Sequence, residues 1–594
     1  MTTYSAPLRD MRFLYHELYD GAELTGLPGY EEATPDLVDA VLEEAAKFCE
    51  NELLPLNRIG DEEGCTYENG VVRTPPGFKA AYEAYTEAGW PALSVDPEYG
   101  GQGMPKTLDF LIEEMVCATN LAFGTYPGLT VGAFNAIKAH GSDDLKQTYL
   151  PNMVAGKWSG TMCLTEPQCG TDLGMVRTRA VPQDDGSFKI TGTKIFITAG
   201  EHDMTENIIH LVLAKLPDAP PGIKGISLFL VPKFMVKEDG SLGARNGVMC
   251  GSIEEKMGIH GSSTCVMNFD DATGWLVGVP HKGMRAMFTM MNAARMGVAC
   301  QGIGLGEATY QMAATYAKER LQGRSVAGPK HPDKPADPLI VHPDIRRMLL
   351  TMRAYTEGNR ALALWITRAL DYVSKHPDPA VRADHEDLAA LLTPIAKAFF
   401  TDCGFEVANL GVQIHGGMGF IRETGVEQYV RDARIAQIYE GANGVQALDL
   451  VGRKLPMNMG RPLRFFFHPV SEYIEAKSSD PALMEFIMPL AKSFGRLQQA
   501  TGWIAQEGMK DPEQAAAAAS DYLRLFGLVA LAYVWTRMAE VALANMDGGE
   551  REFYAAKVAT ARFFMKRLLP QSSALFAALM SGADTLMDFE EAAF

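Results

Sequence analysis

The 594-residue sequence lacks the cysteine patterns that mark a disulfide framework or a zinc site. Its nine cysteines are scattered and odd in number, and none forms a CxxC pair. We expect them to be reduced thiols that act as small core residues. No uninterrupted apolar run approaches the roughly 20 residues of a membrane span, and the first ten residues lack the basic start and apolar stretch of a signal peptide. These absences predict a cytoplasmic protein with no membrane partner.

Positive charge is also scarce. The chain has 54 Lys and Arg against 73 Asp and Glu, a net charge of −19, which opposes a general attraction to nucleic acid or anionic lipid. A phosphate-bearing ligand therefore needs a local basic site. Nucleotide-binding fingerprints are missing too, because no P-loop occurs and the glycines at 302, 304 and 306 precede Glu307 within a helical pattern. Glycines in that setting more often allow close helix packing.

The periodicity of apolar residues divides the chain. A chain of this length predicts three or four domains. The apolar residues first recur at helical spacing, then form short strand-like runs separated by turns, and then return to helical spacing. The predicted parts are an N-terminal extension, an N-terminal helical domain, a middle β domain, a C-terminal helical bundle and an appended helical domain, at 1–34, 35–155, 156–278, 279–456 and 457–594.

Three long helices are expected in the second helical region, at 284–322, 342–376 and 383–409. The proline-rich segment 327–338 separates the first two of them. Proline removes a backbone donor and interrupts helices, so this segment is predicted to be an exposed loop.

A lone carboxylate, Glu440, follows two apolar residues and precedes a glycine in Ile438-Tyr439-Glu440-Gly441. Burial raises the pKa of a carboxyl group, so a buried glutamate here suits a general base for a weakly acidic C–H proton near neutral pH. The ordinary alternative is a glutamate in the first turn of a helix, where it complements the helix dipole. The segments 413–420 and 429–434 that precede it favour the base.

Together these segments resemble the carboxy-terminal half of an acyl-CoA dehydrogenase, in which a QxxGGxG turn, an RDxR segment and an Ile-Tyr-Glu-Gly sequence follow one another. Two further blocks, at 163–172 and 192–198, match the same family, and the resemblance covers roughly residues 35–455. It implies an α+β multidomain fold with an N-terminal helical domain, a middle β-barrel-like domain and a helical bundle. An extra C-terminal helical domain follows in this chain.

The resemblance implies α,β-dehydrogenation of an acyl-CoA thioester, with Glu440 as the base that removes the α-proton. No amino-acid side chain accepts hydride, so the reaction needs a cofactor, and by resemblance this is FAD. An electron-transfer flavoprotein is the implied electron acceptor. Family members share flavin sites between paired subunits, and the appended domain is expected to occupy the face that otherwise forms a tetramer, which implies a homodimer. No nucleic-acid partner is expected.

The resemblance also assigns cofactor-binding residues, each carried over by its position in a family motif. Cys163 and Thr165 are expected to touch the isoalloxazine ring. Phe196 covers the ring where tryptophan is frequent, and Thr198 bonds near flavin N5. Arg320 and Gln322 are assigned to the pyrophosphate, and the turn of Gln413, Gly416 and Gly417 to the adenosine half bound by the partner subunit. Ala442 stands where threonine is usual, so one hydrogen bond is lost or rerouted through Asn443.

A second group of residues is assigned to the substrate. Thr171 stands where a serine usually meets the CoA thioester. Arg295 is expected near the catalytic carboxylate and the CoA arm, with Met291 and Asn292 facing the same ligand and Gly441 beside the base. Without the family blocks, all of these positions have ordinary structural explanations: a loop, a strand residue or a surface side chain. No metal site is expected.

The segments 6–13, 342–350 and 440–455 resemble a long bacterial subgroup. That subgroup includes enzymes that act on 3-(methylthio)propanoyl-CoA in dimethylsulfoniopropionate breakdown, and we take this thioester as the expected substrate. Its members also oxidise ordinary fatty acyl-CoAs, so a general short- or medium-chain dehydrogenase stays open. So do an acyl-CoA oxidase and a DNA-associated flavoprotein of the alkylation-response branch. The last needs a basic carboxy-terminal face, whereas residues 457–594 carry 13 Lys and Arg against 16 Asp and Glu, a net charge of −3.

Overall fold

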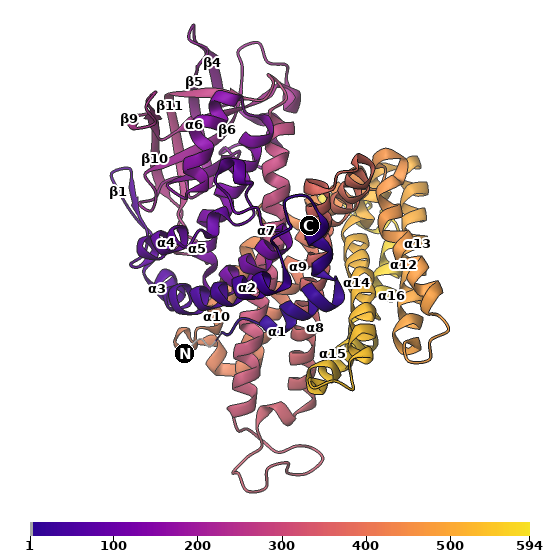
Figure 1. Cartoon of the computed structure of the whole chain (residues 1–594). Coiled ribbons are helices and arrows are strands. Elements are labelled where there is room, and N and C mark those ends of the chain that lie inside the picture. Colours follow the sequence, from indigo (N-terminus) through magenta and orange to yellow (C-terminus); the bar gives the residue numbers. More distant parts are fainter. Residues whose placement is uncertain (1–3) are drawn as a thin grey trace. The chain divides into compact units, whose positions relative to one another are not determined.

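The computed structural model describes residues 4–594 (Figure 1). Residues 1–3 of the expected N-terminal extension lie outside the described part. The chain forms two compact units. The mixed unit comprises Lys47–Met104 and Met115–Gly297, and the helical unit comprises residues 4–46, Pro105–Glu114 and Val298–Phe594.

Helices build the first part of the mixed unit, as the periodicity predicts. They are α3 (Leu54–Glu63), α4 (Phe78–Glu87), most of α5 (Lys106–His140) and α6 (Asp143–Val154). Helix α5 is interrupted at Asn120, where φ is −159° and the side-chain oxygen accepts a hydrogen bond from Phe123 N at 3.1 Å. A short hairpin of β1 (Thr66–Glu68) and β2 (Val71–Arg73), which the helical pattern does not predict, follows α3.

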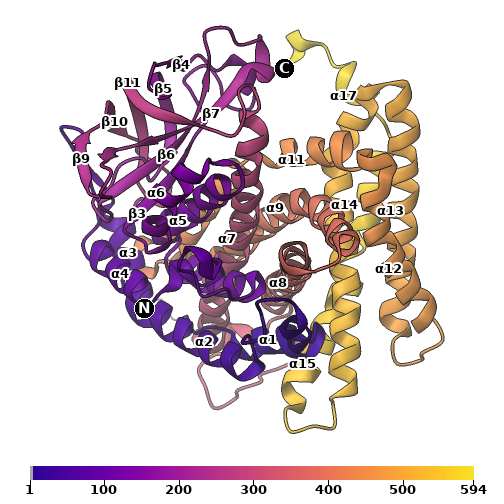
Figure 2. The same ribbon diagram turned by 45° about the horizontal axis from the view of Figure 1, so that its top comes forward.

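The strands of the mixed unit close into a barrel-like sheet (Figure 2). The strand order is β10-β11-β5-β4-β6-β3, and β7 pairs with both β11 and β6. That double pairing joins β11, β5, β4, β6 and β7 into a ring, so the predicted β-barrel-like domain is confirmed. The strands are β3 (Trp158–Cys163), β4 (Arg179–Pro182), β5 (Phe188–Thr198), β6 (Asn207–Lys215), β7 (Ile226–Pro232), β10 (Val248–Ile253) and β11 (Thr264–Val277), with a separate hairpin of β8 (Phe234–Val236) and β9 (Leu242–Arg245).

The helical unit begins with α1 (Leu8–Arg12) and α2 (Pro35–Phe48), and its centre is formed by three long helices. These are α7 (Gly283–Glu319), α8 (Pro343–Lys375) and α9 (Pro379–His415), so all three predicted helices are confirmed. Helix α9 starts four residues earlier than expected because the Asp378 carboxylate caps it, accepting from Ala380 N at 2.8 Å. It ends at Gly416, whose φ is +61°. Two short helices follow, α10 (Val426–Arg434) and α11 (Asn443–Asp449).

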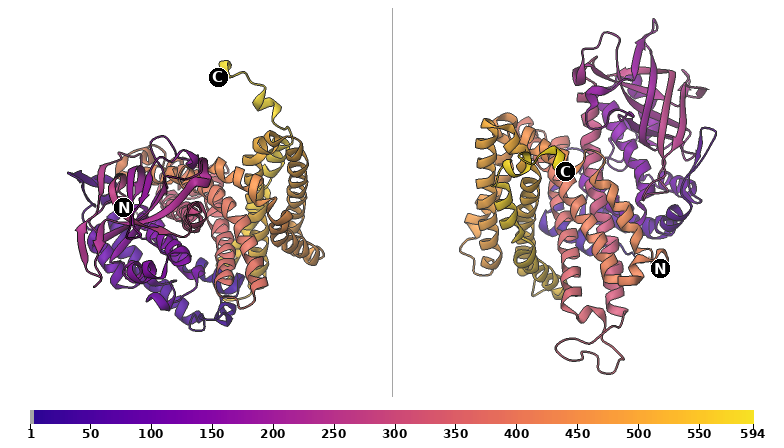
Figure 3. Two further views of the ribbon diagram at one scale, coloured as in Figure 1. Left: turned by 90° about the horizontal axis from the view of Figure 1, so that it is seen from above. Right: turned by 180° about the vertical axis from the view of Figure 1, so that it is seen from behind.

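The appended region is helical, as expected (Figure 3). Its central helix, α14 (Pro512–Ala544), packs against α8 and α9. By length and composition two segments in residues 4–594 could cross a membrane, Pro379–Phe420 and α14, but 83% of the apolar window of each is buried inside the protein. They therefore form the core of the helical unit. The other appended helices are α12 (Arg461–Lys477), α13 (Met484–Lys510), α15 (Arg551–Phe563), α16 (Gln571–Leu579) and α17 (Asp584–Met587).

The glycines of α7 serve helix packing, as the sequence indicates. A Cβ at Gly302 would lie 2.5 Å from the carbonyl oxygen of Phe400, and a Cβ at Gly404 would lie 2.5 Å from the carbonyl oxygen of Gly302. Backbones of α7 and α9 thus touch directly at this point, and no room is left for a methyl group.

We expect Gly404→Ala to lower the free energy of unfolding by about 1–3 kcal/mol, because the added methyl must push two backbones apart. The matched control is Gly495→Ala in α13, where a Cβ meets nothing within 4 Å and alanine is expected to stabilise the helix by about 0.5–1 kcal/mol. Urea unfolding of both variants measures the two effects. Equal stabilisation by both would contradict the close contact.

A buried ionic cluster links distant segments of the helical unit. Arg360 on α8 is 0% exposed and binds three carboxylates: its Nε donates to Glu114 at 2.9 Å, Nη1 to Asp10 at 2.5 Å and Nη2 to Glu307 at 2.7 Å. Lys557 on α15, also 0% exposed, donates to Asp10 and, at 2.6 Å, to Glu357. The amino-terminal segment, α5, α7, α8 and the appended domain therefore share one charge network, which the sequence does not reveal.

The proline-rich insertion is an exposed loop, as predicted, but a buried carboxylate organises it. Asp337 is 0% exposed and accepts hydrogen bonds from the backbone N–H groups of Ser325, Lys330 and His331 at 2.7–3.1 Å. These donors, with Ser325 contributing most, hold the pKa of Asp337 well below its usual range. Leu339 N donates to Arg320 O at 2.9 Å, which fixes the end of the loop to the end of α7.

Candidate active site

Glu440 lies on the loop between α10 and α11. The loop leaves the helix at Ile438, which is 50% exposed, and Glu440 itself is half-buried rather than buried as the sequence predicted. The apolar neighbours do not cover it because Ile438 points outward. Glu440 has φ +55° and Gly441 φ +86°. Since α11 starts only at Asn443, Glu440 is not in the first turn of a helix, and that alternative is wrong.

Side chains inside the helical unit hold this loop. Lys397 Nζ donates to Gly441 O at 2.7 Å and to Asn443 Oδ1 at 2.9 Å. Gln446 Nε2 donates to Glu440 O at 3.1 Å and to Gly441 O at 3.3 Å. The carbonyl groups of both residues therefore face the protein interior.

Asn443 points toward α9. Its Nδ2 donates to Ala398 O, Thr401 Oγ1 and Asp402 Oδ1 at 2.7–3.1 Å, and its Oδ1 accepts from Lys397. Both ends of the amide are engaged within the unit, so the expected rerouting of a flavin hydrogen bond through Asn443 finds no support. Ala442, the adjacent position, is half-buried.

In the mixed unit, a buried ion pair joins the two predicted flavin blocks. The carboxylate of Glu166 accepts from Lys194 Nζ at 2.8 Å, from Thr178 N and Oγ1, and from Arg177 N. Lys194 is 0% and Glu166 3% exposed. The pKa of Glu166 falls to about 2, because Lys194 and these hydrogen bonds outweigh the cost of burial. Ile195 N donates to Thr165 O at 2.9 Å, so the segment around Thr165 is attached to strand β5 near Phe196.

Phe196 is not an ordinary strand residue. The pairing of β5 with β11 shifts register between the partners of Cys265 and Met267, so Ile195 and Phe196 form a β-bulge. Phe196 has φ +59°, and the residue is 58% exposed. Bulges redirect side chains beside functional sites. Thr198, two residues further, is half-buried and ends the strand.

The predicted residues of the Thr-Glu-Pro block differ in exposure. Cys163 is fully buried, and burial raises the pKa of its thiol to about 12. The Cys163 side chain belongs to the barrel core, so any ligand contact falls to its backbone. Thr165 is half-buried, whereas Thr171 is exposed. Behind Cys163, His210 is fully buried with its Nδ1 2.8 Å from Thr161 Oγ1, and burial lowers its pKa to about 3.

The three predicted substrate residues of α7 lie in the part of that helix that belongs to the mixed unit. Arg295 is buried, and its Nη1 lies 3.5 Å from Asn292 Oδ1. Asn292 is exposed and Met291 half-buried. The three share one stretch of helix, as their spacing predicts.

The predicted phosphate and adenosine residues gather at one end of the helical unit. The rings of Tyr316 on α7 and His415 on α9 stack with centroids 4.3 Å apart, which brings the ends of both helices together. Arg320, Gln322 and Gln413 are all exposed there. A Cβ at Gly416 or Gly417 would meet nothing within 4 Å, so this turn is open. His415 is buried, with Nδ1 2.7 Å from Gly411 O, and serves packing as the sequence indicates.

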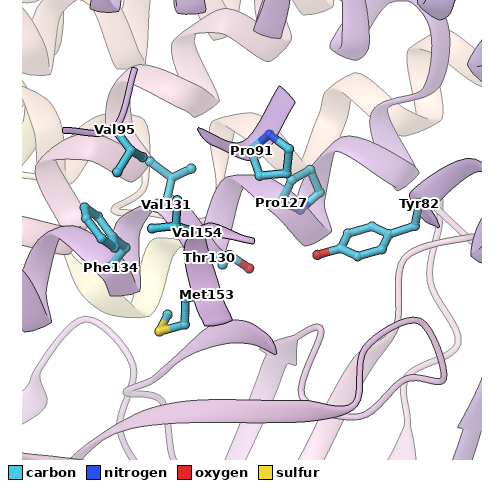
Figure 4. A pocket seen from close by; sticks show the side chains of 9 residues that line it. All are labelled: Tyr82, Pro91, Val95, Pro127, Thr130, Val131, Phe134, Met153 and Val154. Atoms are coloured by element: carbon cyan, nitrogen blue, oxygen red, sulfur yellow. The ribbon is translucent and has the colours of Figure 1, made fainter. Parts of the chain in front are cut away.

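One small pocket lies elsewhere in the mixed unit, between α4, α5 and α6 (Figure 4). Its volume of about 10 Å³ accommodates no more than about one water molecule. Its lining is mostly apolar, with Tyr82, Pro127, Phe134 and Met153 among its residues. This pocket is too small for an acyl chain. Among residues 4–594, no cluster of three or more His, Cys, Asp or Glu could hold a metal ion.

Known families cover most of the chain. Four family models match, described as the acyl-CoA dehydrogenase N-terminal domain, middle domain and C-terminal domain and as an acetyl-CoA dehydrogenase C-terminal-like domain. They span residues 36–157, 161–272, 281–455 and 466–590. A 3-methylmercaptopropionyl-CoA dehydrogenase of Ruegeria pomeroyi is 44% identical over 98% of this chain and 99% of its own length. The chain belongs to the acyl-CoA dehydrogenase family.

Other members are similar over the whole length. A butyryl-CoA dehydrogenase of Syntrophomonas wolfei is 34% identical over 100% of this chain and 99% of its own. A solved acyl-CoA dehydrogenase of Bacillus anthracis in complex with FAD shares the fold, with a TM-score of 0.75 and 22% identity over 93% of this chain and 89% of that one. As an acyl-CoA dehydrogenase, this chain is a flavin-dependent oxidoreductase.

Three residues that position these segments were missed from the sequence: Glu166, Lys194 and Lys397. Each is a buried charge, and the available signal was a lone charged residue in apolar surroundings, as for Lys397 within Ile395-Ala396-Lys397-Ala398-Phe399. Buried lysine and glutamate are rare unless they are paired. Their partners are distant in sequence and become visible only in the fold.

The Glu166–Lys194 pair predicts a pH-dependent stability. The folded-state pKa of Glu166, about 2, lies below its usual value of 4.5, so the pair stabilises the fold fully above pH about 5 and loses this contribution as pH falls toward 2. Glu166→Gln should therefore lower the thermal midpoint most at pH 6–7, with the difference from wild type narrowing below pH about 5. Thermal melts at several pH values test this. A difference that widens on acidification would contradict it.

Proposed function

We propose that the chain oxidises 3-(methylthio)propanoyl-CoA to 3-(methylthio)acryloyl-CoA, with Glu440 as the base that removes the α-proton. The observation that carries the substrate is the 44% identity, over nearly the whole of both chains, to the 3-methylmercaptopropionyl-CoA dehydrogenase of Ruegeria pomeroyi. The base is supported by its place on a loop that the protein holds in a left-handed conformation. Strained backbone of this kind clusters at active sites.

The residues present fit FAD. An aromatic ring exposed at a bulge, Phe196, suits a planar ligand, and the open turn at Gly416 and Gly417 allows the close approach that a nucleotide needs. Bound FAD supplies the acceptor for the two electrons and hydrogen that leave Cβ. The residues that we propose to contact FAD are Cys163, through its backbone, Thr165, Phe196, Thr198, Arg320, Gln322 and Ala442. We propose that Gln413, Gly416 and Gly417 receive the adenosine half of the flavin bound by the partner subunit.

In this proposal the chain's own groups bind and polarise the thioester. Arg295, Met291, Asn292 and Thr171 contact the CoA thioester. The Glu440 backbone N–H donates to the thioester oxygen, beside Gly441. A donor at that oxygen stabilises the negative charge that develops when the α-proton leaves. The Glu440 carboxylate then takes the proton.

We further propose a cytoplasmic homodimer that passes electrons to an electron-transfer flavoprotein. Support for a second copy comes from the turn after α9, where Met418, Phe420 and Ile421 are 44%, 85% and 41% exposed. A cluster of large apolar side chains at a surface marks an interaction site.

We also propose the domain boundaries 1–34, 35–155, 156–278, 279–456 and 457–594. The ranges of the four family models support them.

The test is anaerobic bleaching of the flavin by 3-(methylthio)propanoyl-CoA, beside butanoyl-CoA and octanoyl-CoA. We expect the thioether substrate to bleach the flavin fastest at equal concentration. If only butanoyl-CoA and octanoyl-CoA bleach the flavin, the proposed dehydrogenation stands but 3-(methylthio)propanoyl-CoA is not the substrate. A peroxide assay in air after reduction separates a dehydrogenase from an oxidase.

Ordinary short-chain acyl-CoA dehydrogenation is the second candidate. The observation that favours it is the 34% identity, also over the whole chain, to the butyryl-CoA dehydrogenase of Syntrophomonas wolfei. The measurement that separates the two is kcat/KM for each substrate. A value for 3-(methylthio)propanoyl-CoA more than about tenfold above that for butanoyl-CoA favours the thioether-specific enzyme.

A further inference from the structure

The backbone of the Glu440 loop is of a kind that folded proteins must hold in place. Glu440 and Gly441 are successive residues with positive φ, +55° and +86°. A residue with a Cβ disfavours this region, and it persists only where the surroundings over-determine it. At Gly441 a side chain would be strained by the positive φ, and its Cβ, 2.4 Å from Gln446 Nε2, would displace the amide that holds the loop.

A buried cation lies under this loop. Lys397 on α9 is 0% exposed, and its ammonium group donates to Gly441 O at 2.7 Å and to Asn443 Oδ1 at 2.9 Å. These two acceptors stand on either side of Ala442. The Lys397 ammonium group therefore fixes both the carbonyl of Gly441, the residue after Glu440, and Asn443, the first residue of α11.

Neighbouring side chains make the attachment two-sided. Asn443 Nδ2 binds Ala398 O, Thr401 Oγ1 and Asp402 Oδ1 on α9. From the α11 side, Gln446 Nε2 donates to Glu440 O and Gly441 O. Hydrogen bonds that involve a charged group are stronger than neutral ones. The bond of Lys397 to Gly441 O is therefore one of two strong links between the loop and α9, the other being the bond of Asn443 to the Asp402 carboxylate, and it is the one that acts directly on the residue after Glu440.

We infer that Lys397 is a positioning residue for the reaction: it fixes the direction of the Glu440 carboxylate by holding the Gly441 carbonyl. This inference rests on the proposed role of Glu440 as the base. Lys397 does not touch substrate in this scheme and exchanges no proton with it. Its loss leaves the loop attached through Asn443 and Gln446 but free to change its φ angles, so proton removal slows while binding of the thioester is retained.

The experiment compares wild type with Lys397→Met, which keeps the side-chain length and removes the donor. Both are loaded with FAD and mixed anaerobically with the acyl-CoA that bleaches wild type fastest, over a range of concentrations. We expect the limiting bleaching rate to fall about 10²-fold, as for a base displaced by about 1 Å, with the substrate dissociation constant changed less than about threefold. If Lys397→Met does not fold, a smaller fall in the limiting bleaching rate in Asn443→Ala, which removes the other acceptor of Lys397, supports the inference.

The matched control is Lys557→Met, which removes a second fully buried lysine of the same unit that does not contact the loop. It should lower stability without changing the bleaching rate of the folded, flavin-loaded protein. An unchanged rate in Lys397→Met, or in Asn443→Ala where the first does not fold, overturns the inference and leaves the proposed function standing. No bleaching of wild type by any acyl-CoA overturns both.

Discussion

Replacing Arg360 by Met is expected to lower the free energy of unfolding of the helical unit by about 3–5 kcal/mol. The guanidinium group is fully buried and neutralises Glu114, Asp10 and Glu307. Burial alone would lower its pKa, but these three carboxylates raise the pKa of Arg360 well above its usual value. Without it, three buried carboxylates face one another with Lys557 as the remaining cation, and uncompensated buried charge is costly.

Urea unfolding followed by the helix signal at neutral pH measures the loss. The control is Arg347→Met, because Arg347 pairs with Asp344 at 2.8 Å on the surface, with side chains 52% and 73% exposed. Surface pairs of this kind contribute about 0–1 kcal/mol. A similar, small loss from both variants would mean that the buried cluster adds little to stability.

Glu440→Gln is expected to lower the rate of flavin bleaching by about 10⁴-fold, the upper end of what a positioned general base supplies. Glutamine matches the shape of glutamate and retains the backbone N–H, so the thioester oxygen keeps its donor and substrate binding is preserved. The amide accepts no proton, and the α-proton stays on the substrate. Stopped-flow absorbance under anaerobic conditions measures the rate, and a spectral shift without bleaching reports binding.

The exposed Glu386, on α9, provides the control: Glu386→Gln should leave the rate within about twofold. Retention of more than a tenth of the wild-type rate in Glu440→Gln would assign the base to another residue. The two carboxylates share a unit and differ in backbone conformation, since among them only Glu440 has a positive φ.

The fold could be predicted because its signals are local. Helical spacing located α7, α8 and α9 within a few residues, and glycines in α7 were correctly interpreted as packing contacts. The hairpin β1–β2 was missed because each strand is three residues long and offers no period to read. Its pairing depends on a turn rather than on a pattern.

The candidate site was predictable only as a set of residues. Motif positions gave Glu440, Phe196 and Arg295, but not the half-exposed setting of Glu440 or the bulge that turns Phe196 outward. Those depend on register and on partners such as Lys397, which lies 44 positions before Gly441. Long-range contacts between buried charges leave little trace in one sequence.

The buried ionic cluster around Arg360 and Lys557 also affects the order in which the parts of the helical unit can fold. Asp10 and Lys557 are 547 positions apart in the chain, yet they share one ion pair. During synthesis Asp10 and Glu357 can pair with Arg360 and Arg353 of α8 once that helix is made, but their second cation, Lys557, is added only with α15. Contacts of such separation slow folding and leave intermediates exposed. The last helices of the chain thus complete the ion pairs of its first residues, and a chain cut before Lys557 would keep only the Arg360 partner of Asp10.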